Sequence, residues 1–554
     1  MLLSQALMRL LRLWDTGRLS GLSDKLAVPS RLRDQLPIVL FQILVRTLRS
    51  QDATGSWGSQ SHEISAYAVL TLVYLSPLPW ASALKPEIEA AIISGRLFLE
   101  QAVSTGSWFQ PAQIWIEKVS YGSKILCQTY CLAAMNAPMA DSLWGKAVSD
   151  LTTVPLKAVE GFLHFFSRLP LFQSSQDSKW KLRSSLIEGY LFLPQLKRIS
   201  RDIFPRDKMA EDKYLEYIPL TWTTKNNLQA TSLSARFLQE MMVISMLNYQ
   251  ADEYMEAVVG EHFENSLEPV REIVRSLCEQ PVKLINGCEN GSASKSCRSE
   301  MNGFEHGVEK AEKPLGSVSL DTVKQTLGRF VHHILGHPKI TMASVCDQTN
   351  LRRELQAFLL AHMVQIEDNY RFSRQTLPET TVPFLSPNGT YFSWVHTTSA
   401  EHTSCPYSFA YVACLTSIGS SDCFNGAYSK YLAQDLCSHL AVMCRQYNDY
   451  GSIKRDREER NLNSVNFPEF HAVKEDETQR QQTDLDESPK AKEDEIKRTL
   501  FEIAEYERDC MMKAMQRLEE RVPARVANML ALFVGVTDLY GQIYVARDIA
   551  SRMR

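Results

Sequence analysis

The feature that most constrains the fold is a helical spacing of apolar residues that recurs along most of the chain. In ISAYAVLTLVYL (64–75) and ARFLQEMMVISMLNYQADEYMEAVV (235–259), apolar side chains return every three or four residues, as the 3.6-residue turn of a helix requires. Alternating strand patterns are scarce, and no Asn-Gly turn joins two of them. The sequence therefore predicts an all-α protein.

The composition is that of a globular protein, and it argues against some classes of partner. Of the 554 residues, 44% are hydrophobic and 22% are charged, so an allowance of about 150 residues per domain permits two to four domains. The net charge of −4 argues against a dedicated nucleic-acid binder, which needs a concentrated basic surface. Twelve cysteines form no CxxC pair, which favours a reduced, cytoplasmic protein.

Two apolar stretches resemble membrane segments only superficially. The first, MLLSQALMRLLRLWDTG at the start, carries Arg9, Arg12 and Asp15 and is predicted to form an amphipathic helix. The second, VANMLALFVGVTDLYGQIYV (526–545), contains Asp538 in a span barely long enough to cross a bilayer. We expect a buried helix there, and no transmembrane segment.

Shifts in composition suggest how the chain is organised. Residues 286–317 are rich in Gly, Ser, Lys and Glu, and residues 471–492 have almost no large apolar side chain, so both are predicted to be mobile surface insertions. Cap-like residues and a proline near residue 150 suggest a boundary. We therefore predict one helical unit over 1–150 and a helical domain over 151–554 that carries both insertions.

The string DEYME (252–256) is the first candidate site. Asp252 and Glu256 are four residues apart, so a helix would stack them on one face. Their flanks are strongly apolar, and buried carboxylates need a partner such as a hard cation. An acidic pair of this kind is more often a solvated helix face, so this string alone is weak support for a metal site.

The string NDYGSIKRD (448–456) is the second candidate. Asn448, Ser452 and Asp456 are spaced at i, i+4 and i+8, which would align three oxygen donors along one helix face. An amide, a hydroxyl and a carboxylate suit Mg²⁺ and leave room for an anionic substrate. The flanking Arg445, Lys454 and Arg455 could hold a phosphate. Alone, NDYGS could equally be a turn with a helix cap.

Together, the two strings are more informative. Two facing helices of this kind could hold Mg²⁺ ions against one diphosphate, and such a site ionises an allylic diphosphate inside a dry apolar cavity.

At this point the residues resemble a known family. DEYME is similar to the DDxxD motif of class I terpene synthases, and NDYGSIKRD is similar to their (N/D)DxxSxxxE motif, with Asp456 where Glu is usual. Further strings look like fungal diterpene synthases of the copalyl diphosphate/ent-kaurene synthase type. These strings are YLEYIPLTWTTKNN (214–227), NDYGSIKRDREERNLNSVNFPEF (448–470), QDATGSWG (51–58) and WIEKVSYGS (115–123). The last two resemble the late part of that family's β domain.

The resemblance implies a fold, a cofactor and a set of site residues. The fold would be a class I terpenoid synthase helical bundle, the α domain, over 151–554, preceded by a partial β domain over 1–150. The activity would be that of a Mg²⁺-dependent carbon–oxygen lyase acting on a diphosphate. The resemblance assigns the Mg²⁺ ions to Asp252, Glu253, Glu256, Asn448, Ser452 and Asp456, and the diphosphate to Arg455. Among them, catalytic roles would fall to Asp252, Glu256 and Asn448.

One family motif is missing from the sequence. The DxDD motif that starts protonation-driven cyclisation is absent, and the nearest string is DLDE at 484–487. We therefore expect copalyl diphosphate as the substrate, supplied by a separate class II cyclase, and ent-kaurene, a pimaradiene or aphidicolan-16β-ol as the product. Two alternatives remain open, namely a cyclase acting on linear geranylgeranyl or farnesyl diphosphate, and a truncated non-catalytic paralogue. QDATGSWG is expected to be structural, with Trp57 packed between helices.

The histidines and aromatic residues do not indicate a function by their spacing. The twelve histidines show no HExxH or comparable ligand spacing, so each is expected at the surface or in the core rather than on a metal. Phe237, Tyr249 and Tyr447 are candidates to face a cavity and stabilise a carbocation through their rings.

Overall fold

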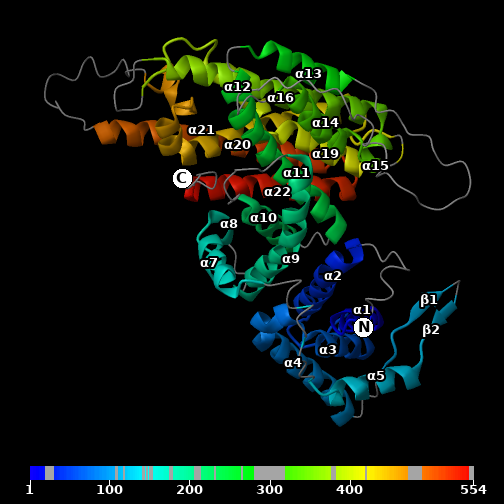
Figure 1. Cartoon of the computed structure of the whole chain (residues 1–554). Coiled ribbons are helices and arrows are strands. Elements are labelled where there is room, and N and C mark those ends of the chain that lie inside the picture. The colour runs from blue at the N-terminus through cyan, green and yellow to red at the C-terminus, as the bar shows by residue number, and fades with distance from the viewer. Residues whose placement is uncertain are drawn as a thin grey trace, which may run out of the picture. The chain divides into compact units, whose positions relative to one another are not determined.

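A computed structural model of the chain is helical almost throughout its described part (Figure 1). The residues that the structure describes are 1–18, 30–105, 110–116, 119–139, 144, 148, 154–173, 179–204, 214–229, 233–263, 266–279, 319–375, 382–417, 419, 421–471 and 489–547. The all-α prediction is confirmed for these residues. The predicted insertion at 286–317 lies outside them, as does most of the one at 471–492, of which only 471 and 489–492 are described.

The chain forms two compact units. Unit 1 comprises Met1–Asp202, Lys208–Met246 and Val534–Arg554, and unit 2 comprises Ile203–Asp207 and Leu247–Phe533. Compactness alone does not assign the domains of a family, so the division near residue 150 stays a prediction.

The described part of unit 1 contains helices and a hairpin of its own, together with parts of two helices that it shares with unit 2. Its own elements are α1 (Leu2–Asp15), α2 (Ser30–Arg49), α3 (His62–Leu75), η1 (Pro79–Leu84), α4 (Lys85–Ser104), β1 (Ile114–Ile116), β2 (Val119–Tyr121), α5 (Lys124–Asn136), α7 (Leu156–Phe166), α8 (Pro170–Gln173), α9 (Lys179–Ile203, of which the last residue belongs to unit 2) and α10 (Tyr214–Leu228). The shared helices are α11 (Ala235–Tyr254) and α22 (Ala524–Ala546).

The helices α2, α3 and α4 pack around Trp57. This indole is 3% exposed, and its Nε1 donates a hydrogen bond of 2.8 Å to the carbonyl of Thr47 in α2. A Cβ added to Gly95 in α4 would lie 2.8 Å from the ring and 2.6 Å from Val69 in α3. The expected structural role of QDATGSWG is confirmed as far as the packing of Trp57 is concerned.

The strands β1 and β2 form a short antiparallel hairpin that the periodicity of the sequence does not predict. Ile114 pairs with Tyr121, and Ile116 pairs with Val119. Each strand has three residues, which is too short for an alternating pattern to stand out against helical periodicity.

Both predictions for the apolar stretches agree with the structure. The helix α1 buries Met8 and Leu11 and exposes Leu2 and Leu3, so it is amphipathic. The helix α22 is long and apolar enough to cross a membrane, but 72% of its most apolar window is buried within the structure. Length and composition alone are weak grounds for a membrane span.

Unit 2 is a bundle of helices that includes two π-helical segments. Its elements are the end of α11, η2 (Met255–Gly260), α12 (Glu261–Phe263), α13 (Glu268–Glu279), α14 (Leu320–Leu335), α15 (Pro338–Thr341), α16 (Val345–Ser373), α17 (Tyr391–Trp394), η3 (Val395–Ser399), α18 (Ala400–His402), α19 (Cys405–Thr416), α20 (Gly426–Glu459), η4 (Ser464–Asn466), η5 (Pro468–Phe470), α21 (Pro489–Glu519) and the start of α22.

The two π-helices of unit 2 follow α11 and precede α18. The first, η2, begins at Met255, directly after α11 ends, and the second, η3, leads into the single turn of α18. The chain then breaks at Ser404, whose φ of 62° lies in the left-handed region that non-glycine residues rarely adopt. Such irregular turns often occur at functional sites.

Candidate functional site

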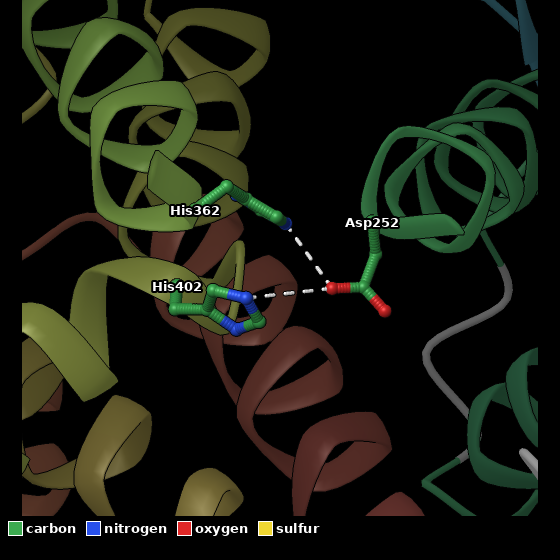
Figure 2. A group of neighbouring side chains, drawn as sticks. All are labelled: Asp252, His362 and His402. Carbon is green, nitrogen blue, oxygen red and sulfur yellow. Dashed lines mark hydrogen bonds and ion pairs between the residues drawn. The ribbon is translucent and has the colours of Figure 1, made fainter. Parts of the chain in front are cut away.

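Asp252 is the residue of the first motif around which the other groups gather. It lies in the last turn of α11, and its side chain is 41% exposed. The carboxylate Oδ1 accepts a hydrogen bond of 3.1 Å from Nε2 of His362 and lies 3.6 Å from Nε2 of His402 (Figure 2). One ligand atom from each of these three side chains lies within 4.8 Å of the other two.

The electrostatic surroundings favour the ionised form of Asp252. Burial raises the pKa of its carboxyl, but the hydrogen bond from His362 and the interactions with the neighbouring histidines and Arg455 outweigh burial and lower that pKa to about 2. The positive charge of Arg455, from the second motif, contributes to this lowering. The carboxylate is therefore ionised at neutral pH.

The histidines come from two other helices. His362 lies in the middle of α16 and is 1% exposed, while His402 ends α18 and is 10% exposed. Their rings are tilted against each other, with centroids 4.1 Å apart. Burial, then His362, lowers the pKa of His402 well below its usual value, so His402 is neutral at physiological pH.

The three residues of the second motif lie on α20, which is α-helical from Gly426 to Glu459. Asn448, Ser452 and Asp456 therefore share one helix face, as the i, i+4 and i+8 spacing predicts. Ser452 and Asp456 are buried, and the Ser452 hydroxyl donates 2.6 Å to Oδ2 of Asp456. Burial raises the pKa of Asp456 to about 6.

A buried amide braces this motif. Asn463, which is 2% exposed, donates from Nδ2 to Oδ2 of Asp456 at 2.7 Å and to the carbonyl of Asp449 at 2.9 Å. The Asp449 carboxylate accepts hydrogen bonds from the backbone N–H of Ser464 at 3.0 Å and from its hydroxyl at 2.6 Å. Asp449 thus links α20 to η4 by hydrogen bonds. This structural role accounts for the presence of Asp449 in the motif, although it is not one of the predicted metal ligands.

Arg445 connects the two motifs. Its Nε lies 2.7 Å from Oδ1 of Asp449, its Nη1 lies 3.4 Å from Nδ1 of His402, and its guanidinium lies 5.4 Å from the ring centre of Trp394. Burial lowers the pKa of Arg445, but the negative charge of Asp449, with smaller contributions from Asp456 and Asp252, raises it above the usual value. The carboxylates of the two motifs are therefore close enough to act on one arginine.

The remaining predicted residues differ in their exposure. Glu256 is exposed and Glu253 is half-buried. Because η2 starts at Met255, a wider π turn replaces the regular α turn that was assumed to stack Glu256 on Asp252. Asn448 is half-buried on α20. Lys454 is 89% exposed and lies 4.0 Å from Glu458, so it points to solvent, whereas the Arg455 side chain is only 23% exposed.

Three residues of this site could not be recognised from the sequence. His362 and His402 lie 110 and 150 residues after Asp252, and neither belongs to a short motif. Asn463 lies within one of the strings that carry the resemblance, but nothing in that string indicates its contacts. His362 lies in the core, as expected of a histidine outside any ligand motif, and His402 is 10% exposed. The contact of both rings with a motif carboxylate was not predicted.

A separate cavity of about 120 Å³ lies between α16, α19 and α20. The residues Glu354 of α16 and Cys437 of α20 line it, and each precedes a site residue of its helix, His362 or Arg445, by eight positions. At 1.5 Å per residue this places the cavity about 12 Å along each helix from the Asp252 group. None of Asp252, His362 and His402 lines it.

Comparison with known proteins supports the resemblance to diterpene synthases over nearly the whole chain. Over 98% of its length the chain is 40% identical to a pimaradiene synthase of Emericella nidulans. It is 33% identical to an ent-kaur-16-ene synthase of Fusarium fujikuroi over its whole length, and to a phyllocladan-16-alpha-ol synthase of Phomopsis amygdali over 94% of its length. The chain is homologous to fungal diterpene synthases. No family model matches it.

This diterpene synthase homologue spans only about half the length of these relatives, namely 54%, 55% and 52% of them in the same order.

The side-chain oxygens of the two motifs are suited to binding a hard cation. In both motifs the protein's own hydrogen bonds converge on one carboxylate oxygen, Oδ1 of Asp252 and Oδ2 of Asp456. The second oxygen of each carboxylate and the Ser452 hydroxyl are the hard ligands that Mg²⁺ prefers. The oxygens of the predicted ligand set therefore suit Mg²⁺ chemically, while its assignment to these residues stays a prediction.

Proposed function

We propose that this chain is a class I diterpene synthase that ionises copalyl diphosphate and cyclises the resulting carbocation to a polycyclic diterpene. The observation that carries the proposal is that Arg445 lies 2.7 Å from Asp449 of the second motif and 3.4 Å from His402, whose other ring nitrogen lies 3.6 Å from Asp252 of the first motif. The names of the relatives, which are diterpene synthases, support the same reaction class.

The proposed reaction starts by breaking the bond between the allylic carbon and the diphosphate oxygen. The electron pair leaves with the diphosphate, and an allylic cation remains. Bound Mg²⁺ would supply charge neutralisation for the leaving group. The ligand oxygens would come from Asp252, with Glu253 and Glu256, and from Asn448, Ser452 and Asp456.

The chain's own cations would also contribute to binding the leaving group. The Arg455 side chain is 23% exposed beside the second motif, and its charge acts on both Asp252 and Asp456. A guanidinium binds phosphate oxygens through paired hydrogen bonds. Arg445 is held by Asp449 and His402, so we assign it to fixing α20 against α18 and assign the diphosphate to Arg455.

The decisive experiment supplies the purified chain with substrates one at a time. Copalyl, geranylgeranyl and farnesyl diphosphate are each incubated with Mg²⁺, and the hydrocarbons and the released diphosphate are measured. We expect product from copalyl diphosphate alone, and product from geranylgeranyl diphosphate only after a class II cyclase is added. Turnover of a linear substrate without that enzyme would overturn the substrate assignment, and no release from any substrate would favour the non-catalytic alternative.

A further inference from the structure

The two oxygens of the Asp252 carboxylate have different surroundings. Both imidazole contacts end at Oδ1, at 3.1 Å from His362 and 3.6 Å from His402. Figure 2 shows the other oxygen pointing away from both rings. A carboxylate can bind through either oxygen, so this arrangement commits one oxygen to the protein and leaves the other for a ligand.

Both edges of the His362 ring face oxygen atoms of the protein. Its Nδ1 lies 2.8 Å from the carbonyl of Phe358, and its Nε2 lies 3.1 Å from the Asp252 carboxylate. Both partners are hydrogen-bond acceptors, so the ring lies between two fixed oxygen atoms. The ring also packs edge-on against Phe358, with centroids 4.6 Å apart, which fixes its orientation in the buried middle of α16.

His402 is oriented by a different neighbour. Nη1 of Arg445 lies 3.4 Å from its Nδ1, and a guanidinium can only donate, so Nδ1 is the accepting atom. Its Nε2 faces Oδ1 of Asp252 at 3.6 Å, which is longer than a direct hydrogen bond. A metal ligand would need its lone pair on Nε2 and hence a hydrogen on Nδ1, facing the donors of Arg445. The arrangement therefore disfavours a histidine-ligated transition metal at this group.

We propose that His362 and His402 are positioning residues that hold Oδ1 of Asp252, so that its second oxygen is presented to the divalent cation. Neither histidine touches the cation. The inference rests on the proposed function, because it assigns a cation to Asp252. It predicts that the histidines set the cation affinity of a carboxylate that comes from another helix.

Mn²⁺ binding to the full-length protein, followed by electron paramagnetic resonance without substrate, tests the proposal. The variants are His362→Ala, His362→Gln, His402→Ala and His402→Gln, with Asp252→Asn to define the site and His332→Gln, an exposed residue of α14, as the matched control. We expect the alanine variants to bind Mn²⁺ about 10- to 100-fold more weakly. The glutamine variants should recover part of the affinity, because an amide can still donate to Oδ1.

Pulsed spectra of the Mn²⁺-loaded wild type give a second readout. We expect no coupling to a directly bound imidazole nitrogen. Such a coupling, lost in either histidine variant, would overturn the proposal because the histidines would then be ligands. Unchanged Mn²⁺ affinity in both alanine variants would also overturn it. If His362→Ala does not fold, as judged by circular dichroism, the glutamine variants and His402→Ala decide.

The outcome is separable from that of the proposed function. A wild type that turns over no prenyl diphosphate, with Mn²⁺ affinity still dependent on both histidines, would refute the synthase and leave the positioning role of His362 and His402 in place. In an active enzyme, His402→Gln should lower kcat at subsaturating Mg²⁺ more than it raises KM for the diphosphate.

Discussion

Two aspartates of the predicted ligand set have opposite electrostatic surroundings. Burial raises the pKa of Asp456 to about 6, because one nearby arginine and two hydrogen-bond donors do not fully offset desolvation. Asp252 is also desolvated, yet its histidines and Arg455 lower its pKa to about 2. Asp252 is therefore ionised before any cation binds. The pKa of Asp456 is higher, so a bound cation would increase its ionised fraction more.

The first prediction concerns these ligand positions. Asp252→Ala and Asn448→Ala should each lower turnover of copalyl diphosphate by orders of magnitude, because each removes a ligand from an open site. The thermal unfolding midpoint should change little, since Asp252 is 41% exposed and Asn448 half-buried. Steady-state kinetics and calorimetry measure the two effects. Lys454→Ala, at an exposed position of α20, is the control, and near-normal activity of both variants would refute the ligand assignment.

At the scale of elements, helix packing in unit 1 depends on the absence of a side chain at one position. Gly95→Ala would place a Cβ 2.6 Å from Val69 and 2.8 Å from Trp57. We expect a loss of roughly 1–3 kcal/mol in the free energy of unfolding from overpacking. Gly161→Ala in α7, where no heavy atom lies within 4 Å, should instead stabilise the protein by roughly 0.5–1 kcal/mol. Urea denaturation of both variants makes the comparison.

The packing of α20 on α21 contains a pH-dependent pair. Nδ1 of His439 lies 2.6 Å from Glu507, which also has His396 at 3.6 Å, while Asp435 lies 3.6 Å from the other ring nitrogen of His439. The hydrogen bond to Glu507 is the main cause that raises the pKa of His439, and burial opposes it. Because the pKa of His439 is higher in the folded protein than in the unfolded chain, where it is about 6.5, its protonated ring stabilises the fold. This stabilisation is fully present at a pH below about 6.5.

The stabilisation from His439 should therefore be lost as the pH rises through the raised pKa of the folded protein. We expect the unfolding midpoint of the wild type to fall from pH 6 to pH 8 by more than that of His439→Gln, which has no titrating ring. Differential scanning calorimetry at several pH values checks this. Equal slopes for the two proteins would show that the His439–Glu507 pair contributes nothing to the pH dependence of stability.

Helical periodicity accounts for what could be predicted about these elements. It predicted the helices that carry Asp252 and Asp456, because spacing alone places side chains on a helix face. It could not predict η2, since the π turn after α11 changes the spacing that periodicity assumes. It also could not predict His362 or His402, because which helices meet Asp252 is decided by tertiary packing. The hairpin at Ile114–Tyr121 could not be predicted because its strands are too short to show an alternating pattern.

At the scale of the whole molecule, unit 1 combines the first part of the chain with the last. The backbone N–H of Leu171 donates 3.0 Å to Gln542 of α22, and Gly535 of α22 lies so close to Lys225 of α10 that a Cβ would overlap it. A chain ending at residue 523 would remove these contacts together with the buried Leu539 and Ile543. We expect its unit 1 to unfold at lower temperature and to bind a hydrophobic dye, while the full chain does not.

This arrangement has a consequence for biosynthesis. Because residues from 534 onward complete the packing of helices made several hundred residues earlier, those helices leave the ribosome before their last partner exists. Lys225 of α10 and Leu171 of α8 then lack their neighbours on α22 until residues 535–542 have been synthesised. The packing of unit 1 is therefore complete only after this segment has left the ribosome, and slow translation lengthens the interval in which the earlier helices are without it.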